Sequence, residues 1–131
     1  ETENVLSKTI IRDHDFNDAV GQTLALYGMG STDYGLALEE LAALCGDDID
    51  HRTTLIFLGD ARSNYSEPRV DILRRLGERA RQVIWLNPEN AGRWGSGDSV
   101  MPRYRPYCTI AETTRTLDDL GRVVERLLKR A

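Results

Sequence analysis

The chain has 131 residues, of which 40% are hydrophobic, so a single domain over residues 1–131 with one core is expected. Its formal net charge of −4 argues against binding to nucleic acid, because that surface needs clustered Lys and Arg. No apolar run approaches the roughly 18 residues of a membrane span.

Cysteine usage and the first residues bear on the compartment. Cys45 and Cys108 lie far apart, and neither has a Cys or His at metal-ligand spacing. We interpret both as free, mostly buried thiols of a reducing environment. The first residues lack the basic and apolar regions of a signal peptide, so a cytoplasmic location is expected.

The first third of the chain is expected to hold one strand and two helices. Residues 5–11 have strand composition, with a lysine that suits an edge strand. Apolar residues fall near helical spacing over 16–27, and the glycines of 28–32 then end this predicted helix. Asp33 can cap a second helix, over residues 34–44.

The remainder alternates between strands and helices. Two apolar runs without alternation, 53–58 and 82–86, predict strands buried on both faces. The other expected elements are a third helix with Pro68 in its first turn and apolar residues from Val70 to Ala80, an ordered loop over 89–106, a short strand over 107–112 and a helix over 117–128. This order predicts an α/β, doubly wound, mostly parallel sheet with helices on both faces.

Polar residues gather where two loops meet the carboxyl edge of this sheet. One loop holds Ser31, Thr32 and Asp33 before a helix, and the other holds Asp60 and Asn64 after a strand. Such oxygen ligands suit Mg²⁺, Mn²⁺ or Ca²⁺ rather than zinc. The alternative is that the first loop only caps a helix and that the aspartate of the second only forms a turn.

Other chemistry has weaker support. His14 and His51 lie in polar surroundings that predict loops, and the chain has neither a Gly-x-Ser-x-Gly elbow nor a P-loop. The glycine-rich residues 95–99 are a weak candidate for a phosphate cradle. Trp94 and Tyr104 lie among arginines in a segment whose composition is that of a protein-binding surface. The alternative is that these aromatic side chains cap the core.

Four segments resemble von Willebrand factor A (VWA) domains. Residues 30–38 (GSTDYGLAL) resemble the Gly-Gly-Thr segment of these domains, and residues 58–64 (LGDARSN) resemble their later aspartate motif. Residues 83–89 (VIWLNPE) and 94–99 (WGSGDS) are similar to the CoxE-like subfamily of bacterial accessory proteins. The resemblance extends from about residue 5 to the end of the chain.

The resemblance implies a metal-ion-dependent adhesion site (MIDAS), which binds a protein rather than catalysing a reaction. Thr32 and Asp60 would be metal ligands, direct or through water, and Ser31, Asp33 and Asn64 would lie around them. A partner commonly adds a carboxylate to the metal shell. Relatives of this subfamily act beside MoxR-type AAA+ ATPases on the metal centres of target enzymes.

The chain departs from the family pattern in one large way. It contains no Asp-x-Ser-x-Ser motif, so it corresponds to the C-terminal two-thirds of a VWA domain and lacks the first strands. The strand at 53–58 is therefore expected to have an open edge, filled by another piece of the protein or by a swapped copy. Mg²⁺ is expected to bind weakly or not at all. Ala61 replaces the glycine usual after the aspartate.

The expected function is divalent-metal-dependent protein binding, not catalysis, in an accessory protein that acts with an AAA+ ATPase in metalloenzyme maturation. One alternative is a Mg²⁺-dependent phosphoryl-transfer enzyme, although such enzymes usually need several acidic groups together. The other is an interaction module that needs no metal and uses residues 94–107.

Overall fold

The computed structural model describes residues 10–13, 23–27 and 33–130. Its centre is a five-stranded sheet with the order β1-β2-β3-β4-β5. The strands are β1 (Ile10–Asp13), β2 (Thr23–Tyr27), β3 (Thr54–Leu58), β4 (Gln82–Asn87) and β5 (Ile110–Thr113). Strands β2 to β5 are parallel to their neighbours, and β1 is antiparallel to β2 at the edge.

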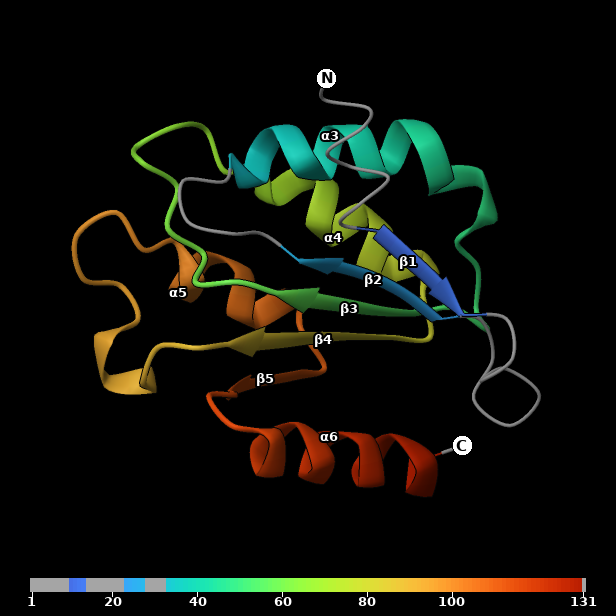
Figure 1. Ribbon diagram of the computed structural model, residues 1–131. Coiled ribbons are helices and arrows are strands. Elements are labelled where there is room, and N and C mark those ends of the chain that lie inside the picture. Colours follow the sequence, from blue (N-terminus) through green and yellow to red (C-terminus); the bar gives the residue numbers. More distant parts are fainter. Residues whose placement is uncertain (1–9, 14–22, 28–32, 131) are drawn as a thin grey trace.

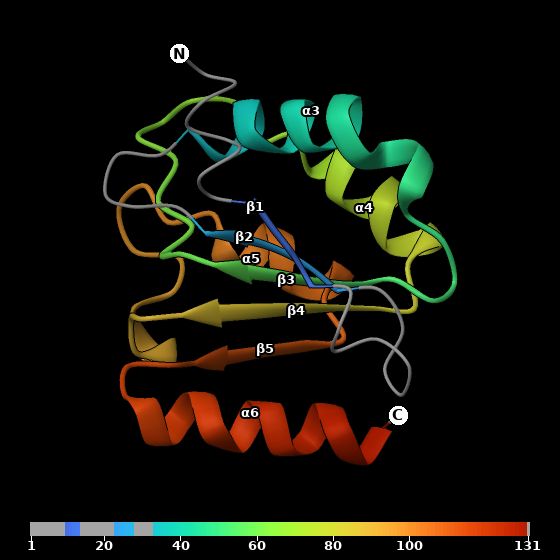
Figure 2. The same ribbon diagram turned by 45° about the vertical axis from the view of Figure 1, so that its right-hand side comes forward.

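Helices lie on both faces of this sheet, as the sequence predicts. Figure 1 shows α3 and α4 over one face and α6 along the other, and Figure 2 shows the same layers after a turn of 45° about the vertical axis. The α-helices are α3 (Tyr34–Cys45), α4 (Val70–Arg79), α5 (Met101–Tyr104) and α6 (Leu117–Arg130), and short 3-10 helices are η1 (Gly46–Asp48), η2 (Ala91–Arg93) and η3 (Arg105–Tyr107). No helix in the described ranges is long and apolar enough to cross a membrane.

The alternation of side chains along β4 explains these layers. Val83 and Trp85 belong to the larger core cluster, together with side chains of α3, α4 and α5. Ile84 and Leu86 point to the opposite face, where they pack with Val123 of α6. All six residues of β4 are buried, which confirms that an apolar run without alternation marks a strand covered on both sides.

The helix expected over residues 16–27 is wrong in its described part. Residues 14–22 lie outside the described residues, but residues 23–27 form strand β2. This strand pairs in parallel with β3 from Thr23↔Thr54 to Tyr27↔Leu58. The run TLALY has no polar residue between its ends, so its spacing does not exclude a strand, and pairing with β3 decides the outcome.

The same strand overturns the prediction of an open edge on the strand at 53–58. β3 has β2 on one side and β4 on the other, so its backbone groups are paired along both edges. An exposed central strand would leave a row of unpaired N–H and C=O groups, and β2 supplies their partners from the same chain. The edge position expected for residues 5–11 holds for its described part, because β1 begins at Ile10 and is the outermost strand.

Both cysteines are free, in agreement with the sequence. Cys45 is buried at the end of α3, and Cys108 is largely buried after η3. Burial raises the pKa of the Cys108 thiol to about 12, so this thiol stays protonated and unreactive near neutral pH.

Candidate functional site

Asp60 is the residue at which the chain leaves β3. The preceding Gly59 is held by the neighbouring strand, because its N–H donates to Leu86 O at 3.1 Å and its carbonyl accepts from Trp85 Nε1 at 2.9 Å. The Asp60 carbonyl accepts from Asn87 Nδ2 at 3.2 Å. These bonds fix the backbone on both sides of a half-buried carboxylate at the carboxyl edge of the sheet.

The Asp60 carboxylate is oriented by two donors. Its Oδ1 atom accepts from the Tyr34 hydroxyl at 3.2 Å and from the Arg62 N–H at 2.9 Å. Burial, and next the charge of Asp60, raise the pKa of Tyr34, so its hydroxyl remains a donor. Gly59 makes room for this contact, because a Cβ atom there would lie 2.1 Å from the Tyr34 hydroxyl oxygen.

Ala61 has a backbone conformation that favours glycine, since its φ is 57°. This explains in physical terms why glycine is the usual residue after the aspartate in the resembling motif. The alanine is nevertheless held in place, because its side chain is fully buried and its carbonyl accepts from Val100 N–H at 2.8 Å.

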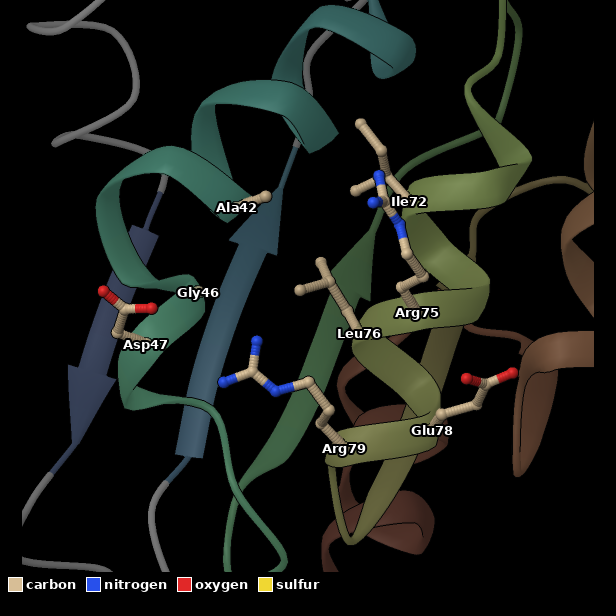
Figure 3. A pocket seen from close by; sticks show the side chains of 8 residues that line it. All are labelled: Ala42, Gly46, Asp47, Ile72, Arg75, Leu76, Glu78 and Arg79. Carbon is tan, nitrogen blue, oxygen red and sulfur yellow. The ribbon is translucent and has the colours of Figure 1, made fainter.

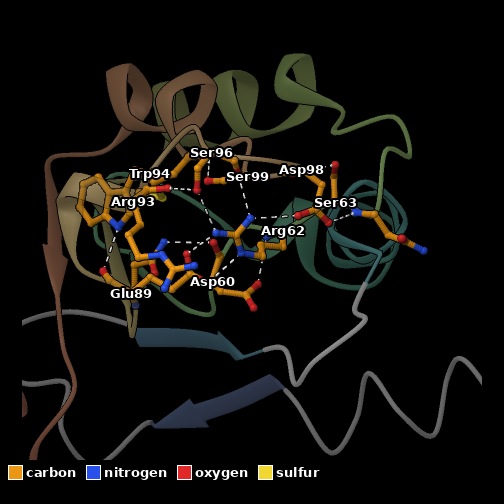
Figure 4. Close-up of polar contacts among 12 residues, drawn as sticks. Asp60, Arg62, Ser63, Glu89, Arg93, Trp94, Ser96, Asp98 and Ser99 are labelled. Atoms are coloured by element: carbon orange, nitrogen blue, oxygen red, sulfur yellow. Dashed lines mark hydrogen bonds and ion pairs between the residues drawn. The ribbon is translucent and has the colours of Figure 1, made fainter.

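Arg62 joins the loop after β3 to the loop after β4 (Figure 4). Its guanidinium donates to both carboxylate oxygens of Glu89, with Nε and Nη2 each at 2.7 Å. It also donates from Nη1 to Asp98 Oδ1 at 3.0 Å and to Ser96 O at 2.8 Å, and from Nη2 to Ser96 Oγ at 3.2 Å. We call Arg62, Glu89, Ser96 and Asp98 the Arg62 clamp.

Asp98 accepts further hydrogen bonds between these loops. Its Oδ2 accepts from Asn64 N–H at 2.8 Å, and its carbonyl accepts from both N–H and Oγ–H of Ser63 at 3.1 Å. Hydrogen bonds from Arg62, and next from Asn64 N–H, lower the pKa of Asp98, and the Arg62 guanidinium lowers the pKa of Glu89. Both carboxylates are therefore fully ionised near neutral pH.

The glycine-rich residues 95–99 have a role different from the phosphate cradle considered above. Gly97, with a φ of 57°, and Gly95, with a φ of 94°, shape a loop whose side chains and carbonyls accept from Arg62. The loop thus binds the guanidinium of Arg62. The sequence contains these residues but gives no sign of the pairing, because 34 and 36 positions separate Arg62 from its partners Ser96 and Asp98.

The structure describes only some of the predicted metal-site residues, and these differ in their contacts. Ser31 and Thr32 lie outside the described residues. The Asp33 side chain caps α3 by accepting from Leu36 N–H at 3.0 Å, which agrees with the structural alternative for this residue. Asn64 is exposed and lies close to Asp60 in sequence, but its backbone N–H is engaged by Asp98.

The two aromatic residues expected to bind a partner differ from each other. Tyr104 is 0% exposed, stacks on Trp85 and donates to Pro68 O at 2.7 Å, so it belongs to the core and its assignment to a partner surface is corrected. Trp94 is partly exposed, its Nε1 donates to Glu89 O at 3.0 Å, and Arg105 lies 5.5 Å from its ring centroid. Trp94 is therefore accessible in part.

The carboxylate at this edge is a type of ligand that divalent ions prefer, but the described residues supply too few ligands to hold such an ion. Asp60 brings a hard carboxylate oxygen, which suits Mg²⁺ or Ca²⁺. Among the described residues, however, no group of three or more His, Cys, Asp or Glu side chains could hold a metal ion. The described residues alone therefore do not form a metal centre.

A separate pocket of about 330 Å³ lies between α3 and α4 (Figure 3). It is lined by Ala42, Gly46, Asp47, Ile72, Arg75, Leu76, Glu78 and Arg79. Gly46 and Asp47 follow the end of α3, and Arg79 ends α4 just before β4 begins, so the pocket is at the opposite edge of the sheet from Asp60. None of the site residues predicted from the sequence lines it.

A carboxylate held at the end of a central parallel strand, in a sheet covered by helices on both faces, defines a Rossmann-like α/β domain. Comparison with family models shows which family within this fold class the chain belongs to. The model described as "VWA domain containing CoxE-like protein" matches residues 7–128, and the chain belongs to this family. No curated protein and no solved structure was found to match it.

The contact between Tyr34 and Asp60 leads to a prediction on stability. Replacing Tyr34 by phenylalanine is expected to lower the free energy of unfolding by about 1 kcal/mol, because an oxygen of the half-buried Asp60 carboxylate loses a donor. Urea unfolding at pH 7 measures this change. Tyr65→Phe is the control, since its hydroxyl has no hydrogen bond within the described residues, and a change of less than about 0.5 kcal/mol is expected. Equal losses in both variants would contradict the prediction.

Proposed function

We propose that this domain binds a protein partner at the edge marked by Asp60, in a manner that depends on a divalent ion. In this proposal it is the accessory component that acts with a MoxR-type AAA+ ATPase in the maturation of a metalloenzyme. Membership of the CoxE-like VWA family supports the proposal. The observation that carries it is the Asp60 carboxylate, held half-exposed at the carboxyl end of β3 by Tyr34 and the backbone of Arg62.

We propose Asp60 and Thr32 as two of the ion's ligands, with Mg²⁺, Mn²⁺ or Ca²⁺ as the ion. Ser31, Asp33 and Asn64 are proposed to surround them. The remaining ligands come from groups beyond the described residues and from a carboxylate of the partner, so the free chain binds Mg²⁺ weakly. A binding role is proposed rather than an enzymatic one, because phosphoryl transfer usually needs several acidic groups around the metal.

The test compares Asp60→Asn with Asp47→Asn, which removes a charge at the opposite edge. Binding of a purified MoxR-type AAA+ ATPase is measured by surface plasmon resonance at constant Mg²⁺, so that the metal needs of the ATPase stay the same. We expect Asp60→Asn to weaken binding about 10-fold or more and Asp47→Asn to leave it unchanged. Equal affinities for both variants, or phosphatase turnover lost with Asp60, would overturn the proposal.

A second candidate function is favoured by the surface around Trp94. Its ring is partly exposed beneath the Arg105 guanidinium, and Tyr107 nearby in sequence is 38% exposed. These residue types are common in interface hot spots. A metal-free interaction through residues 94–107 is indicated if Trp94→Ala abolishes binding of the ATPase while Asp60→Asn leaves it intact.

A further inference from the structure

Tyr65 has a conformation that its residue type rarely adopts. Its φ is 61°, and the preceding Asn64 has a φ of 53°, so two consecutive residues occupy the left-handed region. Asparagine tolerates this region, whereas tyrosine is strained there. The Tyr65 side chain is also 82% exposed, against 38% for Tyr107. The strain is thus not offset by burial of the ring.

Hydrogen bonds on both sides keep the loop in this conformation. Tyr65 N–H donates to Ser63 Oγ at 3.1 Å, and the Ser66 hydroxyl and N–H donate to Ser63 O at 2.6 and 3.1 Å. Asn64 N–H is bound to Asp98 of the Arg62 clamp. The described residues offer no hydrogen-bond partner to the Tyr65 hydroxyl. The loop therefore holds an aromatic ring in solvent, five residues after Asp60, at a cost that asparagine would avoid.

Two exposed carboxylates lie beside this loop. Glu67 is two residues beyond Tyr65, and its carbonyl oxygen is so close to α3 that a Cβ on Gly35 would lie 1.9 Å from it. Asp33 is at the start of the same helix. Because Asp33 caps the helix that contains Gly35, the close approach of Glu67 to Gly35 brings Asp33 and Glu67 to the same part of the surface. Within the described residues neither carboxylate forms an ion pair.

We infer that Tyr65 is an anchor of the partner interface and that the partner segment which covers it is cationic, with a Lys or Arg over the tyrosine ring. The inference rests on the proposed function, because it assigns the chemistry of the partner that binds at the Asp60 edge. A cation over the ring is attracted by its π-system, and Asp33 and Glu67 complement the remaining positive charge of the segment. Tyrosine is one of the residue types enriched in interface hot spots.

The first test uses Tyr65→Asn. Because asparagine tolerates a positive φ, this variant is expected to raise the Tm by about 3 °C. It is also expected to weaken binding of the purified AAA+ ATPase about 10-fold or more, since the ring is lost. Leu117→Asn is the control, because Leu117 is 86% exposed and lies at the start of α6 on the other face of the sheet, and we expect no gain in Tm and unchanged binding. A higher Tm with unchanged binding in Tyr65→Asn would overturn the inference.

The second test addresses charge. Glu67→Gln removes one negative charge beside Tyr65 and leaves Asp33, which the proposed metal site also uses, unchanged. We expect weaker binding and a smaller loss of affinity between 50 and 300 mM salt, both consistent with a cationic partner segment. Unchanged or tighter binding would overturn that assignment.

The outcomes separate this inference from the proposed function. Loss of binding in Asp60→Asn, with normal binding in both Tyr65→Asn and Glu67→Gln, supports the metal site and overturns the inference. Loss of binding in Tyr65→Asn and Glu67→Gln, with normal binding in Asp60→Asn, supports the inferred surface and overturns the metal site.

Discussion

Replacement of Trp85 by alanine is expected to lower the free energy of unfolding by about 3–5 kcal/mol, a large part of the stability of a domain of this size. The Trp85 side chain is 1% exposed and stacks on Phe57 and Tyr104, with both ring centroids 5.0 Å away. The ring of Tyr34 packs against it at 5.7 Å. The substitution therefore opens a cavity where β3, β4, α3 and α5 meet.

The effect of Trp85→Ala reaches the functional edge through two contacts. The indole N–H donates to Gly59 O, directly before Asp60, and the Tyr34 ring that packs on the indole carries the hydroxyl bound to Asp60. Trp85→Phe retains an aromatic ring but removes the indole N–H, so it separates packing from hydrogen bonding. We expect it to cost clearly less than the alanine variant, and loss of the bond itself to account for about 1 kcal/mol.

Chemical denaturation of both variants, followed by circular dichroism, measures these changes. Trp94→Ala is the control, because Trp94 is partly exposed and packs at the edge of the core. Its expected loss is well below that of Trp85→Ala. Equal losses for the two tryptophans would contradict the assignment of Trp85 to the centre of the core.

The sequence was most informative where burial alone determines an element. The apolar runs predicted as strands at 53–58 and 82–86 form β3 (Thr54–Leu58) and β4 (Gln82–Asn87), and α4 begins at Val70, two residues after the Pro68 expected in its first turn. Residues 23–27 show where this reasoning fails. Their apolar residues fit a helix and a strand equally well, and pairing with β3, about 30 positions away in sequence, decides between them. Local spacing contains no information on that partner.

At the candidate site, too, the sequence predicted some features and not others. The position of Asp60 followed from the end of a buried strand, and its nearest neighbours did not. The Tyr34 hydroxyl can reach Asp60 because Gly59 has no side chain in the way. The Arg62 N–H reaches Asp60 because the backbone turns after this residue. The Arg62 clamp depends on residues 27 to 36 positions apart, so neither composition nor local spacing could predict it.

The Arg62 clamp leads to the second large effect. Arg62→Met retains much of the aliphatic stem but leaves the carboxylates of Glu89 and Asp98 without their guanidinium, and their side chains are only 23% and 22% exposed. At pH 7 we expect a loss of about 1–2 kcal/mol in the free energy of unfolding, because hydrogen bonds to partly buried charges are removed. Glu89→Gln is the matched control, since it keeps the shape of the side chain and loses its charge.

The pH dependence of this effect has a definite sign. The guanidinium lowers the pKa of both Glu89 and Asp98 in the folded chain, so the unfolded chain binds more protons below about pH 5. The stability contributed by the clamp is therefore present above the unfolded pKa values, about 4, and is lost as the pH falls through the folded values. Urea unfolding at pH 7 and pH 3 should show a gap between wild type and Arg62→Met that narrows at pH 3. A gap of the same size at both values would mean that Arg62 stabilises the loops by packing rather than by charge.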